Sequence, residues 1–385
     1  MSWYSVKLGN IADFSNGINF SKDAYTKGVK LIGVSNFGNR FHPEYETLAE
    51  IKEEVVKKSD LLISGDIVFV RSNGNKELVG RCMLINCPLE KVTYSGFCIR
   101  ARLKDMTKHD PVFWTYHFKN IAFRRAMTGT AIGANIQNLS QGRLANYEAT
   151  IPDIETQRRI ANILSSYDDL IENNQKQIKL LEEAAQRLYK EWFVDLRFPG
   201  YEDVAVVDGV PEGWKKSLIG DVIEKVSHSK HVKATDYLSE GTIPVIDQSR
   251  DFIAGFTNDT ETLVNIGCSV IVFGDHTRIL KYVQFPFATG ADGTQLIVSC
   301  NDNMPQSLLY CSLVAVDLSN YHYARHFKYL KAEEILVSTK EIADKFDAIV
   351  SPILQQIQKL RDISNRSAQA RDRLLPKLMS GELEV

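Results

Sequence analysis

Apolar residues recur at helical spacing along a long stretch in the middle of the chain. Between Ile160 and Trp192 they follow alternating steps of three and four residues, a heptad pattern typical of a helix that packs against another long helix. Charged residues fall outside this seam, as on a solvated helix face. The pattern predicts a helix from about Asp168 to Phe193, which would span roughly 39 Å at 1.5 Å per residue.

A similar seam near the C-terminus is less regular. Its ends are apolar, but Ser364, Ser367 and Arg371 occupy its middle, which weakens the prediction of a coiled coil there. Because proline removes an amide donor and restricts the preceding residue, Pro352 predicts a short helix before it and a longer one after it. The residues expected to pack the two helices together are Ile171, Ile178, Leu181, Leu188, Trp192, Ile357, Leu360, Leu374 and Leu378.

The segments that precede the two helical regions resemble each other. Residues 3–11 and 214–222 share a Trp, an aliphatic residue, a Gly, an Asn or Asp and a second aliphatic residue in register, and residues 65–70 and 267–272 are both short apolar, β-branched runs typical of buried strands. Coincidence among common apolar residues could explain any one match. Several matches in the same order favour a duplicated chain.

We therefore expect an α+β fold in which two mixed α/β globular domains, in a pseudo-twofold arrangement, are separated by two long antiparallel helices that form a coiled-coil spacer. The expected divisions are residues 1–152 and 201–337 for the globular domains and residues 153–200 and 338–385 for the helical regions. Such helices would hold the domains about one turn of B-DNA apart, roughly 34 to 36 Å. The alternative is that the helices only dimerise the protein.

Composition places the chain among ordinary globular proteins. Of its 385 residues, 44% are hydrophobic and 24% are charged. No run is apolar enough for a membrane span, and the first residues lack a signal-peptide pattern, so we expect a cytoplasmic protein.

The net charge of −2 conceals an excess of six positive charges in residues 1–152 and of seven negative charges in residues 199–336. The acidic half is an obstacle for a DNA-binding hypothesis, although phosphates respond to charge within a Debye length.

Motifs of catalysis are absent from the sequence. No phosphate-binding loop, dinucleotide-binding glycine motif, H-E-x-x-H or nucleophile elbow occurs. The Pro-Pro of an amine methyltransferase motif is also missing, and the six cysteines form no C-x-x-C pair. His228 and His231 have no companion at metal-ligand spacing. The sequence therefore predicts a non-catalytic chain with no metal or cofactor of its own.

Glycine-containing loops with planar hydrogen-bonding side chains occur in both halves, several of them after predicted strands. Arg can pair bidentately with guanine and Asn or Gln with adenine, whereas Lys and Ser suit phosphate. For each loop, an ordinary glycine-rich turn is the alternative. The candidates for DNA contact in the first half are Arg71, Asn73, Asn75, Lys76, Arg124, Arg125, Thr128, Thr130, Asn135, Gln137 and Asn138. Those in the second half are His276, Arg278, Lys281, Thr294, Gln295, Tyr321, Arg325, His326 and Lys328.

Three segments, residues 151–164, 192–200 and 374–383, resemble the specificity subunit of Type I restriction-modification systems. The resemblance extends over essentially the full chain. It implies two target recognition domains, each of which reads one half of a bipartite site in double-stranded DNA, with the helices fixing the spacer. Two modification subunits that bind S-adenosylmethionine would dock on the helices, and two restriction subunits would add ATP- and Mg-dependent translocation and cleavage.

Two other functions remain open at this point. A coiled-coil protein-interaction scaffold without DNA readout would bind random and cognate duplexes equally weakly at any salt concentration. A stand-alone nuclease or methyltransferase would show activity as a purified chain supplied with metal or methyl donor.

Overall fold

The computed structural model describes residues 3–38, 40–75, 78–86, 90–128, 138–226, 230–290, 293–321 and 325–385. The chain divides into two compact units. The first unit consists of residues 1–173 and 363–385, and the second unit consists of residues 174–362. None of the helices in the described part of the chain is long and apolar enough to cross a membrane.

Among its described residues, the first unit contains three small sheets and four short α-helices besides its parts of the two long helices. Its four-stranded sheet has the order β2 (Ala12–Asn16), β8 (Cys98–Leu103), β5 (Ile67–Val70) and β6 (Cys82–Leu84). The other sheets are β4 (Ala49–Ile51), β3 (Tyr25–Ile32) and β7 (Val92–Tyr94), and the pair β1 (Tyr4–Lys7) and β9 (Glu148–Ile151). The short helices are α1 (Leu8–Ile11), α2 (Pro111–Lys119), α3 (Ile121–Thr128) and α4 (Gln141–Asn146).

In the part of the second unit that the structure describes, there are two four-stranded sheets, two strand pairs and three short α-helices besides the long ones. One sheet has the order β13 (Ile223–Lys225), β20 (Thr294–Ser299), β17 (Val270–Gly274) and β18 (Leu280–Val283). The other has the order β15 (Gly255–Thr257), β14 (Ile243–Ile246), β19 (Phe287–Thr289) and β16 (Leu263–Val264). The pairs are β10 (Val206–Val207) with β11 (Val210–Pro211) and β12 (Lys215–Leu218) with β21 (Glu334–Val337), and the helices are α6 (Ile219–Val222), α7 (Gln306–Ala315) and α8 (Phe327–Ala332).

Strand order confirms that the chain is duplicated. The sheets β2-β8-β5-β6 and β13-β20-β17-β18 have the same order and are antiparallel throughout. In each unit a second sheet contains one parallel pair, β3 with β7 and β14 with β19. In each unit an antiparallel pair, β1 with β9 or β12 with β21, leads directly into a long helix. The mixed α+β architecture expected from the sequence is therefore present in both units.

The long helices begin and end at other residues than the sequence indicated. Helix α5 (Ile154–Tyr189) begins fourteen residues before the expected start and continues as a π-helical turn over Lys190–Val194. The Asp153 carboxylate accepts a hydrogen bond from the Thr156 amide at 2.9 Å, which is the geometry of an N-cap. Asp168 therefore lies in the middle of the helix, where it is buried.

Helix α9 (Lys340–Ser380) passes through Pro352 without a break, so the division expected there was wrong. Pro352 lies on the exposed face of the helix, whereas Val350 and Leu354 are buried in the core of the second unit. A proline in a helix interior costs about 3 kcal/mol. Burial of the neighbouring apolar residues outweighs this cost, and water can reach the carbonyl that the proline leaves without a donor.

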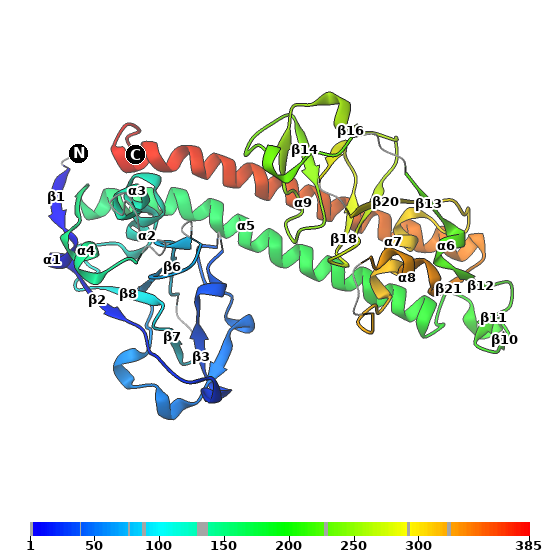
Figure 1. Cartoon of the computed structure of the whole chain (residues 1–385), viewed down its shortest axis with the longest axis horizontal. Helices are drawn as coiled ribbons and strands as arrows, with labels where there is room; N and C mark the ends of the chain where they lie inside the picture. The colour runs from blue at the N-terminus through cyan, green and yellow to red at the C-terminus, as the bar shows by residue number, and fades with distance from the viewer. Residues whose placement is uncertain are drawn as a thin grey trace. The chain divides into compact units, whose positions relative to one another are not determined.

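The two long helices pair antiparallel in each unit. In the first unit the start of α5 packs against the end of α9, with Ile160 and Leu164 in one cluster with Leu378 (Figure 1). In the second unit the end of α5 packs against the start of α9, with Ala185 and Trp192 beside residues of α9. Of the expected packing residues, the buried ones are Trp192, Ile357, Leu360 and Leu378, and the half-buried ones are Ile171, Ile178, Leu181, Leu188 and Leu374.

An ion pair links the two long helices in each unit. In the first unit Arg371 of α9 pairs with Asp168 of α5, which also accepts a hydrogen bond from the Tyr116 hydroxyl at 2.5 Å. In the second unit Arg361 of α9 pairs with Glu182 of α5 at 2.8 Å. The polar middle of the second seam, which weakened the coiled-coil prediction, therefore contains an arginine whose partner lies on the other helix.

His117 of α2 gives a prediction for the acid stability of the first unit. Its ring is buried, neither ring nitrogen hydrogen-bonds to a described residue, and burial lowers its pKa from 6.5 to about 4. Between these values the unfolded chain binds more protons than the folded chain. The free energy of unfolding should therefore fall by about 3 kcal/mol as the pH is lowered from 6.5 to 4.

Urea unfolding of the wild type and of His117→Leu over this pH range measures that contribution. We expect the variant, which has no ionisable group there, to lose less stability in acid than the wild type. Equal losses for the two proteins would contradict the assignment to His117.

Candidate nucleic-acid interface

In the second unit, four segments meet beyond the end of β17. The Asp275 amide donates to the Gly293 carbonyl at 2.8 Å, and the Asp275 carboxylate accepts from the Phe327 amide at 2.8 Å. The His276 amide donates to the Gln248 side-chain oxygen at 3.2 Å, and the Thr277 hydroxyl donates to the Gln248 carbonyl at 2.8 Å. The loops after β14 and β17, the turn before β20 and the start of α8 therefore form one hydrogen-bonded cluster, which we call the second-unit loop cluster.

Arg278 ties a further segment to this cluster. Its guanidinium donates to the His326 ring at 3.2 Å and to the Tyr321 carbonyl at 2.8 Å. Burial, followed by the positive charge of Arg278, lowers the pKa of His326, which favours a neutral ring that can accept this hydrogen bond. Arg278 and Arg325 have φ values of 62° and 81°, in a region that costs energy for residues other than glycine. Both strained residues belong to segments predicted from the sequence to contact DNA.

The predicted contact residues of the second half differ in their access to solvent. Exposed ones are His276, Arg325 and Lys328, and half-buried ones are Arg278, Gln295 and Tyr321. Buried ones are Lys281, Thr294 and His326. Because Lys281, Thr294 and His326 are buried, they are not placed to contact DNA directly. We therefore assign them a structural role beneath the loops. The sequence did not show this because the groups that cover them come from distant segments.

In the first unit, two of the predicted loops lie side by side. Arg71 follows β5, and its carbonyl accepts from the Leu139 amide at 2.9 Å, while Ser72 forms a β-bridge with Asn138. The Arg71 guanidinium donates to the Gly96 carbonyl at 3.2 Å. Because β5 and β17 occupy the same place in equivalent sheets, this loop is the counterpart of the loop that begins at Asp275.

The remaining residues predicted in the first half are distributed over one helix and the loop ends. Asn75 and Asn138 are exposed, and the Asn73 side chain accepts from the Asn75 amide at 2.7 Å. Arg125 on α3 is exposed, and Arg124 is half-buried. The predictions for Lys76, Thr130, Asn135 and Gln137, and for the side chain of Thr128, lie outside the described residues.

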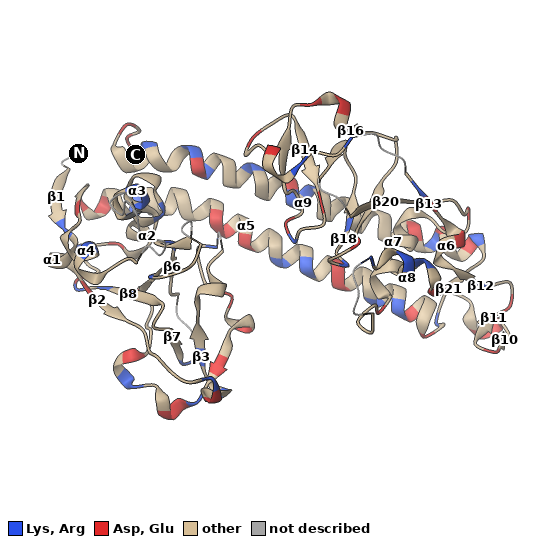
Figure 2. Ribbon diagram, viewed as in Figure 1, with Lys and Arg blue, Asp and Glu red and all other residues tan. Residues whose placement is uncertain are grey.

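Lys and Arg residues occur on α3 in the first unit and on α8 in the second (Figure 2). In the second unit they lie in an otherwise acidic region of the sequence, directly after His326, which belongs to the loop cluster. Local charge of this kind can attract phosphate even where the surrounding domain is acidic.

Sequence reasoning missed the loop that follows β14. This loop contains Gln248, which accepts from the His276 amide, and Arg250, which is exposed. A polar run, Asp-Gln-Ser-Arg-Asp, comes directly after the short, mainly apolar run Ile-Pro-Val-Ile at residues 243–246, and a polar loop after such a run is the signal that identified several of the other loops. The run contains no glycine, so the criterion of a glycine-containing loop did not identify it.

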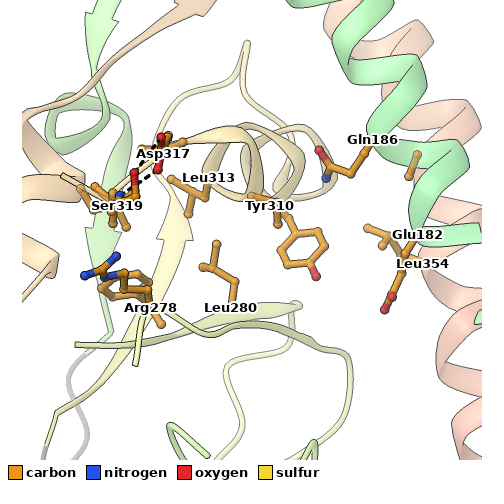
Figure 3. A pocket seen from close by; sticks show the side chains of 15 residues that line it. Glu182, Gln186, Arg278, Leu280, Tyr310, Leu313, Asp317, Ser319 and Leu354 are labelled. Atoms are coloured by element: carbon orange, nitrogen blue, oxygen red, sulfur yellow. Dashed lines mark hydrogen bonds between the residues drawn. The ribbon is translucent and has the colours of Figure 1, made fainter. Parts of the chain in front are cut away.

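A cavity of about 450 Å³ in the second unit is lined by Arg278 and by residues of α5, α7 and α9 (Figure 3). Leu280, Leu313 and Leu354 supply apolar walls, and Tyr310 and Glu182 add a hydroxyl and a carboxylate. Its lining contains no His, Cys or Lys. Among the described residues, no group of three or more His, Cys, Asp or Glu is placed to hold a metal ion.

Comparison with known proteins identifies relatives of the chain. Residues 2–183 match the family model of the type I restriction modification DNA specificity domain. Over 297 residues the chain is 28% identical to the type I restriction enzyme MjaIX specificity subunit of Methanocaldococcus jannaschii, covering 70% of this chain and 68% of that protein. Over 100 residues it is 34% identical to the type I restriction enzyme EcoR124I/EcoR124II specificity subunit of Escherichia coli, covering 26% of this chain and 24% of that protein.

A solved structure shares the fold. The crystal structure of the type I restriction-modification system S subunit from M. genitalium superposes with a TM-score of 0.60 at 17% sequence identity, covering 98% of this chain and 96% of that one. The duplicated topology and the sequence matches agree. Residues 2–183 are therefore similar to the type I restriction modification DNA specificity domain, and the chain over most of its length is similar to the specificity subunits of type I restriction enzymes.

Proposed function

We propose that this chain is the sequence-specific DNA-recognition subunit of a type I restriction-modification complex, and that each unit reads one half of a bipartite site. One observation carries the proposal. The chain has duplicated a sheet with one strand order, and in both copies the polar loop after the equivalent strand, β5 or β17, is hydrogen-bonded to a neighbouring loop, through the Arg71 guanidinium in the first unit and the Thr277 hydroxyl in the second. Two similar readers in one chain suit a site with two separate halves.

The partners follow from the same proposal. Two modification subunits would dock on α5 and α9 and bind S-adenosylmethionine, and two restriction subunits would supply ATP- and Mg-dependent translocation and cleavage. This chain would be non-catalytic and would bind none of these cofactors itself. The long helices would fix the number of unread base pairs between the half-sites.

Methylome sequencing tests the proposal. A host that expresses this chain together with its modification subunit should methylate one motif that has two specified parts and a constant unspecified spacer. A host that expresses the modification subunit alone should lack this methylation. A single uninterrupted motif, or no new methylation, would contradict the proposal.

The alternative function, a protein-interaction scaffold without DNA readout, is distinguished by binding. In the presence of the modification subunits, a scaffold would bind a cognate duplex and a random duplex with equal, weak affinity at every salt concentration. We expect the cognate duplex to bind about a thousandfold more tightly or better, as specific DNA-binding proteins commonly do.

A further inference from the structure

Lys281 of β18 is buried beneath the loop after β14, so its charged group is not exposed at the surface. Its side chain is 3% exposed. The ammonium group donates to the carbonyl of Asp247 at 2.8 Å and to the carbonyl of Asp251 at 2.5 Å, and it lies 3.8 Å from the Asp247 carboxylate. One lysine therefore holds both ends of the segment 247–251.

The same segment is joined to the loop after β17. Gln248 accepts hydrogen bonds from the His276 amide through its side chain and from the Thr277 hydroxyl through its carbonyl. Within the segment, the Asp247 carboxylate accepts from the Ser249 amide at 2.9 Å. The path of the chain at residues 247–251 therefore sets the position of the exposed His276.

A second anchor lies just after the segment. The Arg361 guanidinium of α9 lies 4.1 Å from the centre of the Phe252 ring, and Arg361 also pairs with Glu182 of α5 at 2.8 Å. A cation over an aromatic face is attracted by the ring quadrupole. The loop is thus held at its base by the sheet and at its far end by a long helix, while Arg250 between the two anchors is exposed.

We infer that residues 247–251 form a DNA-reading segment of the second unit, that Arg250 contacts the half-site, and that Lys281 is a positioning residue that touches no DNA. The inference rests on the proposed function. It replaces the expectation that Lys281 binds phosphate, because a buried ammonium that already donates to two carbonyls has no access to a duplex.

The chemistry at this position favours lysine. An ammonium group offers three donors from a single point, so it can reach two carbonyls that belong to residues four positions apart. Methionine has a similar length and buries well but has no donor. Lys281→Met would leave the carbonyls of Asp247 and Asp251 without this donor, and the segment would lose its fixed path.

Binding measurements on the complex with its modification subunits separate the roles of the two residues. The duplexes carry the two cognate half-sites, with either the first or the second half replaced by random sequence. For Arg250→Ala we expect the discrimination at the second half-site to fall about tenfold, as for an arginine that contacts a base. For Lys281→Met we expect a similar loss of discrimination at the second half-site and no change in the slope of log K against log salt.

Hydrogen exchange of the free chain gives a readout that does not depend on DNA. In Lys281→Met the amides of residues 248–251 and 276–278 should exchange faster, while those of residues 71–75 in the first unit should be unchanged. Because Arg250 is exposed, the amides of Arg250→Ala should exchange at the same rates as those of the wild type. The DNA-reading role of the segment can therefore be tested with this variant even if Lys281→Met does not fold.

The outcomes distinguish failure of the inference from failure of the proposed function. A salt slope that falls by about one in Lys281→Met would show that Lys281 touches phosphate and would overturn its positioning role. Unchanged discrimination in Arg250→Ala would show that the segment does not read DNA, although the wild type does. If the wild type itself discriminates neither half-site, the proposed function fails instead.

Discussion

Exchanging residues 1–152 for the corresponding segment of another type I specificity subunit should change one half of the recognised site and leave the other half unchanged. The first unit supports this expectation, because its strands β1 to β9 all lie within residues 4–151 and α5 begins at Ile154, after the exchanged segment. Each mismatched base pair costs about 1–3 kcal/mol, so two or three mismatches should lower affinity for the original half-site by roughly a hundredfold or more.

The methylated motif of the exchanged chain measures the result. The matched control is an exchange of residues 201–337, which should change the other half-site. The donor segment must also pack on this chain's helices, where Ile160, Leu164 and Leu378 lie in the core of the first unit. A change in both half-sites, or in neither, would refute the assignment of one reader to each unit.

Arg371→Ala should lower the free energy of unfolding of the first unit by about 3–5 kcal/mol, because it would leave a buried carboxylate without its ionic partner. Asp168 is 6% exposed, and besides Arg371 it accepts a hydrogen bond from Tyr116 of α2. Burial and the negative charge of Asp168 both raise the pKa of Tyr116, so its hydroxyl stays protonated and neutral and donates a hydrogen bond without balancing the charge of the carboxylate. Urea unfolding monitored in the first unit measures the loss.

The internal repeat supplies a matched control for this variant. The equivalent strands β9 and β21, which lead into the long helices, end at Ile151 and Val337, 186 residues apart. At this distance the counterparts of Asp168 and Arg371 in the second unit are Leu354 and Ala185, which line the cavity there. The double variant Asp168→Leu with Arg371→Ala therefore copies an arrangement that the chain already uses. It should recover at least half of the lost stability, since replacement of a buried ion pair by apolar residues is often close to neutral.

An exposed ion pair provides the second comparison. Arg158 and Glu155 pair at 3.0 Å on the surface of α5, and Arg158→Ala should cost less than about 1 kcal/mol. A loss of this small size for Arg371→Ala, or a double variant as unstable as the single one, would show that the buried pair does not hold the two helices together.

Local pattern was sufficient for the larger features of the fold. The heptad spacing from Ile160 onward predicts a long helix, and a less regular seam with apolar ends predicts helix near the C-terminus, where α9 lies. The matches between residues 3–11 and 214–222 predict a duplication, which strand order confirms. The helix prediction depends only on residues that are close together in sequence, and the duplication follows from comparing one segment of the chain with another. Both can be read from a single sequence.

The boundaries of the long helices depended on weaker signals. Asp153 followed three residues later by Thr156 is a capping pattern that could have placed the start of α5. No local signal could show that α9 continues through Pro352. Its continuation depends on Val350 and Leu354 packing into the core of the second unit, and the residues that form this core come from distant parts of the chain.

Local sequence pattern was enough to show that the chain is duplicated and that each copy ends in a long amphipathic helix, and it marked the glycine-containing loops whose side chains could hydrogen-bond to bases. Which of these side chains face solvent became clear only from the tertiary structure. Lys281 and Arg250 have similar charge and lie near each other in the fold, yet one is buried against the carbonyls of Asp247 and Asp251 and the other is exposed. The reason is that side-chain chemistry and periodicity are local properties, whereas the cover over a polar head group comes from segments about thirty residues away along the chain.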